Sequence, residues 1–186
     1  MEESSTMKPL VAARIFTLLE PGPVVLVTTR HGGKSNIMTI SWTMVLDFTP
    51  RFAICTGAWN HSFTALEKTR ECVIAIPPAD MLDTVIGIGT CSGADTDKFT
   101  RFGLTPSKGK HVQAPLIAQC LANIECRVAE IIAPHGIVVL DGLAAYVDHQ
   151  KSDQRMLHAV GDGTFVADGE RFDRKEAMRS KLPDGV

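Results

Sequence analysis

The sequence lacks several features that would assign it to a broad functional class. Its 186 residues contain no apolar run near the roughly 18 residues that a membrane-spanning helix needs. The N-terminal stretch MEESSTMKPL is acidic and polar, whereas a signal peptide begins basic and continues apolar. A formal net charge of -2 provides no general basic field. We therefore expect a cytoplasmic protein that binds neither nucleic acid nor a membrane.

Local signatures of metal, nucleotide or nucleophile chemistry are also missing. The five cysteines are an odd number without a CxxC pair, so we expect reduced thiols, several of them buried. No HExxH occurs, and we assign no metal ligands, although ligands gathered by the fold would leave no local signature. The segment Gly87 to Gly93 reads GxGxxxG instead of GxGxxG, which favours a glycine-rich helix end. No Ser-His-Asp or Cys-His arrangement is visible, so we assign no catalytic side chain.

The chain does contain short β-branched and apolar runs separated by turn residues. The run VVLVTTR, residues 24–30, precedes Gly32-Gly33, which suits a tight hairpin turn, and residues 36–44 (NIMTISWTM) are the expected return strand. In a strand, alternation places one set of side chains on an apolar face: Met38, Ile40, Trp42 and Met44. The hydroxyls of Thr39, Ser41 and Thr43 then face either water or a polar ligand, and alternation leaves that choice open.

The remaining elements follow from the same signals. Residues 62–71 have helical periodicity, and Thr64 followed three residues later by Glu67 fits a capping box. We expect further strands at residues 51–56, 72–77, 121–132 and 137–149, short helices at 79–88 and 95–102, and a short apolar piece at 164–166. This order lacks strict strand-helix alternation, so it predicts a mainly β fold, a small antiparallel barrel with helical insertions.

Two polar segments are candidate ligand sites. In WNHSFTALEKTR, residues 59–70, small polar residues open a helix, where free N–H groups and the hydroxyls of Ser62 and Thr64 suit a phosphate or simply cap the helix. In DTDKFTRFGLT, residues 95–105, Lys98 and Arg101 lie three apart on neighbouring positions of one helix face. Lys98 is either solvated or reaches over the barrel mouth to a ligand oxygen.

Three motifs occur in register along residues 18–150. They are NxMTxSW at residues 36–42, NHSFTALEKTRECVI at residues 60–74, and SG followed by DKF at residues 92–93 and 97–99. Together they resemble the flavin reductase-like, FMN-binding split-barrel family, and the flavoredoxin branch is the nearest match. The resemblance implies a Greek-key antiparallel split barrel that holds FMN non-covalently in a homodimer, with the isoalloxazine ring near the dimer interface.

The resemblance also implies the residues that contact the cofactor. It assigns the flavin contacts of the first hairpin to Asn36, Met38, Thr39, Ser41 and Trp42, and the ribityl and phosphate contacts to Asn60, Ser62 and Thr64. Lys98 would approach the polar edge of the ring, where a cation stabilises negative charge on the reduced flavin. His135 and Phe165 resemble family positions near the flavin; the alternatives are an exposed turn histidine and a phenylalanine that packs the tail.

The implied activity is that of an FMN-dependent oxidoreductase. NAD(P)H or a redox protein partner would deliver electrons to bound FMN, which passes them to a free flavin, a metal centre or a partner protein. Because NAD(P)H stacks on the flavin in this family, the lack of a separate nicotinamide motif does not exclude either a reductase or an electron carrier without NAD(P)H turnover. A third alternative is a cofactor-free barrel that acts in binding or assembly. Residues 1–150 would form the domain, and residues 151–186 an extension that packs on the barrel or the partner subunit, with a charged end that its composition allows to be disordered.

Overall fold

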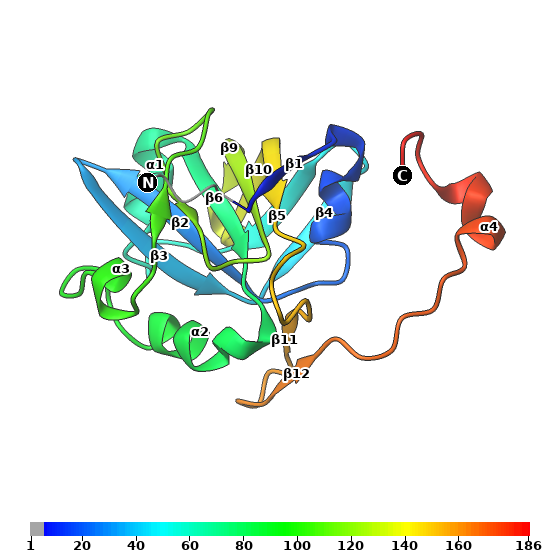
Figure 1. The fold of residues 1–186 in the computed structure, drawn as a ribbon. Coiled ribbons are helices and arrows are strands. Elements are labelled where there is room, and N and C mark those ends of the chain that lie inside the picture. The colour runs from blue at the N-terminus through cyan, green and yellow to red at the C-terminus, as the bar shows by residue number, and fades with distance from the viewer. Residues whose placement is uncertain (1–5) are drawn as a thin grey trace.

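The structure, a computed structural model, describes residues 6–186. Residues 1–5, which begin the acidic N-terminal stretch, lie outside the described residues. The centre of the molecule is an antiparallel sheet that curves around an apolar core (Figure 1). Its strands follow the order β3 (Lys34–Ile40), β2 (Val25–His31), β6 (Glu71–Ile76), β9 (Ala122–Ile132), β10 (Ile137–Val147), β5 (Arg51–Cys55) and β4 (Thr43–Asp47). The short β1 (Lys8–Leu10) also pairs with β10.

Side-chain alternation gives this sheet two apolar faces. On the β2–β3 hairpin, Val27 and Met38 face the main core inside the curved sheet. Leu26 and Ile37 point to the outer face and join a second cluster, which α2 (Leu82–Gly89) covers together with η2 (Ala79–Met81) and α3 (Lys98–Arg101). Since β3 and β4 end the strand order and do not pair among the described residues, the sheet stays open as an antiparallel split barrel with helical insertions, as predicted.

Both predicted hairpins are confirmed. Gly32 and Gly33 adopt φ values of +56° and +78° in the β2–β3 turn, a conformation that glycine reaches without steric cost. The long strands β9 and β10 form the second hairpin, and η3 (Ala133–His135) occupies the predicted turn between them. Residues 87–89 end α2, as expected for a glycine-rich helix end.

The prediction of one strand over residues 36–44 is wrong. The chain leaves β3 after Ile40 and re-enters the sheet at Thr43, at its opposite edge, where Thr43 pairs with Ile54 of β5. The interruption at Ser41 and Trp42 removes the expected common face. Met38 and Ile40 stay buried, whereas Trp42 and Met44 are 72% and 55% exposed.

The predicted capping box is also wrong. Helix α1 (Phe63–Thr69) begins two residues earlier than that motif requires, with Ser62 at the N-cap and no side-chain cap hydrogen bond. Thr64 is therefore the second helical residue, and both its side chain and that of Glu67 are exposed. The reason is that the preceding turn, in which Phe63 N–H donates to the Asn60 carbonyl, fixes where the helix starts.

Two further segments carry no pattern that predicts them. η1 (Ala12–Leu18) buries Ile15 and Phe16 at one end of the main core. Residues 106–117, here called the strap, contain β7 (Pro106–Ser107) and β8 (Leu116–Ile117) and lie across the outer face of the sheet.

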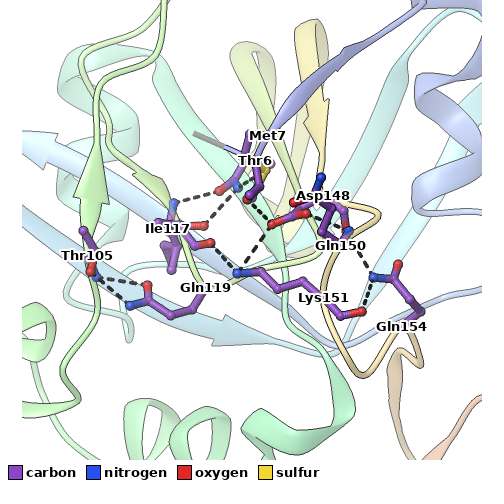
Figure 2. A network of polar contacts seen from close by, with 11 residues as sticks. Thr6, Met7, Thr105, Ile117, Gln119, Asp148, Gln150, Lys151 and Gln154 are labelled. Carbon is purple, nitrogen blue, oxygen red and sulfur yellow. Dashed lines mark hydrogen bonds and ion pairs between the residues drawn. The ribbon is translucent and has the colours of Figure 1, made fainter. Parts of the chain in front are cut away.

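The extension beyond residue 150 begins firmly attached to the barrel. The buried carboxylate of Asp148 accepts hydrogen bonds from Thr6 Oγ1 and, at 2.9 Å, from the Gln150 amide, and it lies 3.6 Å from Lys151 Nζ (Figure 2). Lys151 Nζ also donates to the Ala118 carbonyl at 3.0 Å. These contacts join the start of the chain, the end of β10 and the loop before β9.

The rest of the extension is a small hairpin and a long arm. The hairpin of β11 (Leu157–Ala159) and β12 (Phe165–Ala167) packs on the second cluster. The arm carries α4 (Lys175–Met178) and η4 (Arg179–Lys181) and stands away from the barrel before the chain end returns toward it (Figure 1). Among residues 6–186, no helix is both long and apolar enough to cross a membrane.

Candidate functional site

A polar cavity of about 780 Å³ lies at the turn end of the β2–β3 hairpin. Its walls are the hairpin, the start of α1, residues 93–97, and Pro106 and Pro115 of the strap. The volume falls within the range of roughly 300–1,000 Å³ that small-molecule sites occupy. Three of the predicted cofactor-binding residues line this cavity: Asn36, Ser62 and Thr64.

The three sequence motifs meet at one point of the cavity wall. Asn36 Nδ2 donates to Ser62 Oγ at 2.8 Å, and Ser62 is only 1% exposed. Gly93 lies directly against Asn36, since a Cβ at residue 93 would come within 2.1 Å of Asn36 Oδ1. A side chain at residue 93 would therefore push the Asn36 amide out of its present position, and residues far apart in the sequence form one polar cluster.

The other predicted residues lie away from this cluster along β3 and the following loops. Thr39 Oγ1 donates to the Val85 carbonyl of α2 at 2.8 Å, so this hydroxyl has a partner in the protein. Met38 is buried in the main core, while Ser41 and Trp42 are exposed. At about 3.3 Å per residue, the stretch of β3 from Asn36 to Ile40 spans roughly 13 Å. Because the Met38 side chain is buried in the main core, Met38 could meet a ligand on this path only through its main chain.

Residues of the loop before α1 form a second polar group. Asn60 Nδ2 donates to Thr56 Oγ1 at 3.2 Å, and Thr56 Oγ1 in turn lies 3.8 Å from Met38 Sδ. The exposed His135 is close in the fold, because the Thr56 amide donates to the carbonyl of Gly136 at 2.8 Å. The structure thus brings His135 next to the Thr56–Asn60 loop, and its contact with a cofactor remains a prediction.

Lys98 is buried and joins β3 to α2. It is 5% exposed, and its Nζ donates to the carbonyls of Ile37 and Ile88, each at 2.8 Å. Burial lowers the pKa of this ammonium, because desolvation disfavours the charged form. The position differs from the solvated lysine considered above, and two of the three N–H donors hold the protein together.

Phe165 lies on β12, where its half-buried ring packs against the second cluster. This packing accounts for a phenylalanine at that position and matches the alternative interpretation given above. An approach of Phe165 to a cofactor remains a prediction.

One buried hydroxyl stands out near the interruption between β3 and β4. Thr43 Oγ1 is the buried side-chain polar atom without a hydrogen-bond partner among residues 6–186. A buried hydroxyl without a partner costs about 1–3 kcal/mol. A ligand atom that reached this point would satisfy it.

We expect Thr43→Val to separate two roles of this hydroxyl. If the hydroxyl has no partner in the working protein, the near-isosteric valine raises the free energy of unfolding by about 1 kcal/mol and leaves ligand affinity unchanged. If it contacts a bound ligand, the affinity falls several-fold. Urea unfolding without ligand and a ligand titration measure the two quantities; Thr90→Val, whose exposed hydroxyl donates to the Gly87 carbonyl, is the control.

The strap is held by side chains of the sheet that sequence analysis did not single out. Both oxygens of the buried Glu125 carboxylate accept two hydrogen bonds. Oε1 accepts from the Lys110 amide at 3.0 Å and the Tyr146 hydroxyl at 2.8 Å, and Oε2 from the amides of His111 at 2.7 Å and Val112 at 2.9 Å. Burial alone would raise the pKa of Glu125, but these four donors hold it below its usual value.

Three more side chains bind the main chain of the strap. Glu71 Oε1 accepts from the Gln113 amide at 2.7 Å, Asn123 Oδ1 from the Ile117 amide at 2.8 Å, and Thr28 Oγ1 donates to the Pro115 carbonyl at 2.6 Å. These tethers come from β2, β6 and β9. They fix the strap, and with it Pro115, as one wall of the cavity.

The residues present fit a phosphorylated flavin. A polar end is formed by the half-buried Asn36 bonded to the buried Ser62, by Gly93, where a Cβ would collide with Asn36, and by the exposed hydroxyl of Thr64. The exposed Trp42 provides an apolar surface further along. Among the described residues, no group of three or more His, Cys, Asp or Glu side chains could hold a metal ion. All five cysteines are free, and Cys72, Cys120 and Cys126 are buried.

Solved structures define the class of this fold. An FMN-binding domain of a flavin reductases-like enzyme from Shewanella baltica aligns with a TM-score of 0.83 at 25% identity, covering 90% of this chain and 96% of that chain. The flavoredoxin of Desulfovibrio vulgaris (Miyazaki F) aligns with a TM-score of 0.76 at 21% identity, covering 94% and 95%. The fold is that of FMN-binding split-barrel domains.

Sequence comparison gives the family. The profile of the flavin reductase like domain matches residues 18–164, and the chain belongs to this family of flavin-related oxidoreductases. It is 30% identical to the uncharacterized protein YddH of Escherichia coli (strain K12), over 88% of this chain and 95% of that protein. An uncharacterized protein of Archaeoglobus fulgidus is 32% identical over 62% of this chain and 66% of that protein, just under two thirds of its length.

Proposed function

We propose that this protein binds FMN non-covalently and acts as an FMN-dependent oxidoreductase. The convergence of Asn36, Ser62 and Gly93 at one end of the cavity is the observation that carries the proposal, because each residue comes from a different motif of the family. The phosphate and ribityl end of FMN would lie here, and the isoalloxazine ring further along β3 toward Trp42. Bound FMN supplies the electron transfer chemistry.

The side chains of this protein bind and orient the cofactor. The hydroxyls of Ser62 and Thr64 donate to oxygens of the phosphate and ribityl chain, and Asn36 fixes the position of Ser62. Lys98 keeps β3 in place through the Ile37 carbonyl, and its third N–H is the donor available to the polar edge of the ring. No side chain needs to form a covalent bond in this chemistry.

A visible spectrum of the purified protein tests the proposal. We expect the absorbance of bound oxidised flavin, or its appearance after incubation with FMN and removal of the unbound cofactor. A colourless protein that binds no added FMN would instead support a cofactor-free barrel acting in binding or assembly.

The electron donor is tested separately. We propose NAD(P)H as the co-substrate, and steady-state assays with NADH and NADPH measure its use. FMN-dependent oxidation of either nucleotide supports a reductase. Oxidation of neither, by a protein that binds FMN, would favour the alternative of an electron carrier served by a redox protein partner.

We also propose that the protein is a homodimer with FMN near the interface. The outward-facing side chains of β4 and the residues at its two ends form an apolar surface, here called the β4 face: Trp42, Met44, Leu46 and Phe48, which are 72%, 55%, 42% and 54% exposed. A row of exposed apolar side chains on an edge strand is an interaction site. A second copy of the chain would cover this face and close the ring end of the FMN site.

We expect Lys98→Met to have two separable effects. The methionine leaves the Ile37 and Ile88 carbonyls without a donor, so the free energy of unfolding without FMN falls by about 2 kcal/mol. It also removes the cation beside the ring, so FMN binds more weakly or its reduction potential falls. Urea unfolding and a spectroscopic titration measure these quantities, with the exposed Lys181→Met as control. If both variants change FMN binding or its potential equally, Lys98 has no specific role.

A further inference from the structure

The turn end of the β2–β3 hairpin places positive groups on the same face as Asn36. In this antiparallel pair Val27 is opposite Met38, Thr29 is opposite Asn36, and His31 is opposite Lys34. Directly opposite residues share a face, and so do residues two apart along a strand. Because Val27 and Met38 enter the main core, His31 and Lys34 lie on that same inner face, two residues beyond the Asn36–Ser62 pair.

These positive groups are unpaired among the residues that the structure describes. Lys34, His31 and His61 all line the cavity and are exposed, and none has an ion pair or a side-chain hydrogen bond within residues 6–186. His61 directly precedes Ser62 at the start of α1. One full positive charge and two imidazoles therefore line the cavity near its polar end.

The other charges of the cavity lie elsewhere on its walls. Arg30 sits on the opposite face of the hairpin, and Asp95 and Asp97 come from the loop before α3. The Asp97 carboxylate accepts from the amide of Thr100 at 3.2 Å and from its hydroxyl at 2.7 Å, so it is engaged at the start of α3. Asp95 faces the cavity as an acceptor, which suits the hydroxyl donors of a ribityl chain.

We propose that Lys34, with His31 and His61 beside it, binds the phosphate dianion of FMN, so that the site distinguishes phosphorylated from unphosphorylated flavins. This rests on the FMN binding proposed above. Lysine is a compact point charge that binds phosphate well, and Lys34 lines the same cavity as the hydroxyls of Ser62 and Thr64. The neutral groups at Asn36, Ser62 and Thr64 would orient the phosphate, and the cation would supply its counter-charge.

The affinities of the protein for FMN and riboflavin, measured by quenching of flavin fluorescence at fixed ionic strength, test this assignment. We expect the wild-type protein to bind FMN at least about tenfold more tightly than riboflavin. In Lys34→Ala the affinity for FMN falls by about tenfold, whereas the affinity for riboflavin stays within about twofold of the wild-type value. Lys68→Ala, an exposed lysine of α1 outside the cavity, leaves both affinities unchanged.

Each other outcome has a distinct meaning. Equal losses of FMN and riboflavin affinity in Lys34→Ala would reveal a structural role and overturn the assignment. So would an unchanged FMN affinity combined with a raised KM for NADPH, since the lysine would then serve the nucleotide. If the wild-type protein binds both flavins equally, the assignment of Lys34 to the phosphate is wrong but flavin binding stands. If it binds neither flavin, the proposed function itself fails.

Discussion

Glu125→Gln is expected to destabilise the protein by about 3–5 kcal/mol, because it breaks a buried network that contains a charge. The carboxylate accepts four hydrogen bonds, two on each oxygen. Glutamine keeps one oxygen and turns an NH2 group toward two of the four donors. The strap then loses its main attachment to the sheet, and the cavity loses one wall. Urea unfolding measured by circular dichroism gives the change in the free energy of unfolding.

Glu71→Gln is the matched control for this prediction. It makes the same chemical change on the same face of the sheet, and Glu71 also binds the strap, but it accepts one hydrogen bond from the Gln113 amide. Glutamine retains the Oε1 acceptor, so we expect a loss below about 1 kcal/mol. Equal losses of unfolding free energy in the two variants would mean that the four hydrogen bonds to Glu125 stabilise the protein no more than the single one to Glu71.

The lowered pKa of Glu125 predicts how the free energy of unfolding depends on pH. The pKa of Glu125 in the folded protein lies below its usual value of 4.5, so the unfolded state binds the proton more tightly. The stabilisation is therefore complete above about pH 4.5 and is lost as the pH falls further, through the folded pKa. Comparing unfolding at pH 7 and pH 3, we expect Glu125→Gln to lose less stability on acidification than the wild-type protein does.

Met44→Glu is expected to raise the dissociation constant of the proposed homodimer by about 100-fold or more, because burying an unpaired carboxylate costs several kcal/mol. Met44 lies in the β4 face and is 55% exposed in the single chain, so the substitution leaves the folded monomer intact. Sedimentation over a range of protein concentrations measures the dissociation constant. Because FMN would lie near this interface, we expect weaker FMN binding in the same variant.

Val166→Glu tests whether this effect belongs to the β4 face. Val166 is 53% exposed on β12, away from β4, and the substitution adds the same charge at a similarly exposed apolar position. We expect it to leave the dimer unchanged. A wild-type protein that stays monomeric at all concentrations, or a dimer equally sensitive at both positions, would contradict the proposed interface.

The elements that sequence patterns predicted best are those whose partners are close in the chain. The β2–β3 and β9–β10 hairpins carry their turn signals between the paired strands, and both predictions are confirmed. The interruption at Ser41 and Trp42 was missed because alternation continues formally through residue 44. After β3 the chain continues as β4, which pairs with β5 on the far side of the sheet. No local signal contains that information.

The candidate site shows the same difference between contacts that are local in the chain and contacts that only the fold makes. The motif residues Asn36, Ser62 and Gly93 meet in the structure, although their residue types alone did not fix their geometry. The role of Glu125 was invisible because its four donors come from the strap and β10, which the fold alone brings to it. The burial of Lys98 could not be predicted, and both a solvated and a ligand-binding lysine stayed open, because its helix has four residues, too few to show which side is buried.

The interruption between β3 and β4 also bears on how related sequences can diverge. A residue inserted within β3 would reverse the faces of every side chain on one side of it, exchanging core positions with outer ones. Ser41 and Trp42 are exposed and lie between the two strands, and the Trp42 carbonyl already accepts from the Cys55 amide of β5 at 3.0 Å. A change of length at Ser41 therefore leaves the register of both neighbouring strands intact. Insertions and deletions among relatives should therefore collect at this junction, which could lengthen or shorten the contact surface without disturbing the core.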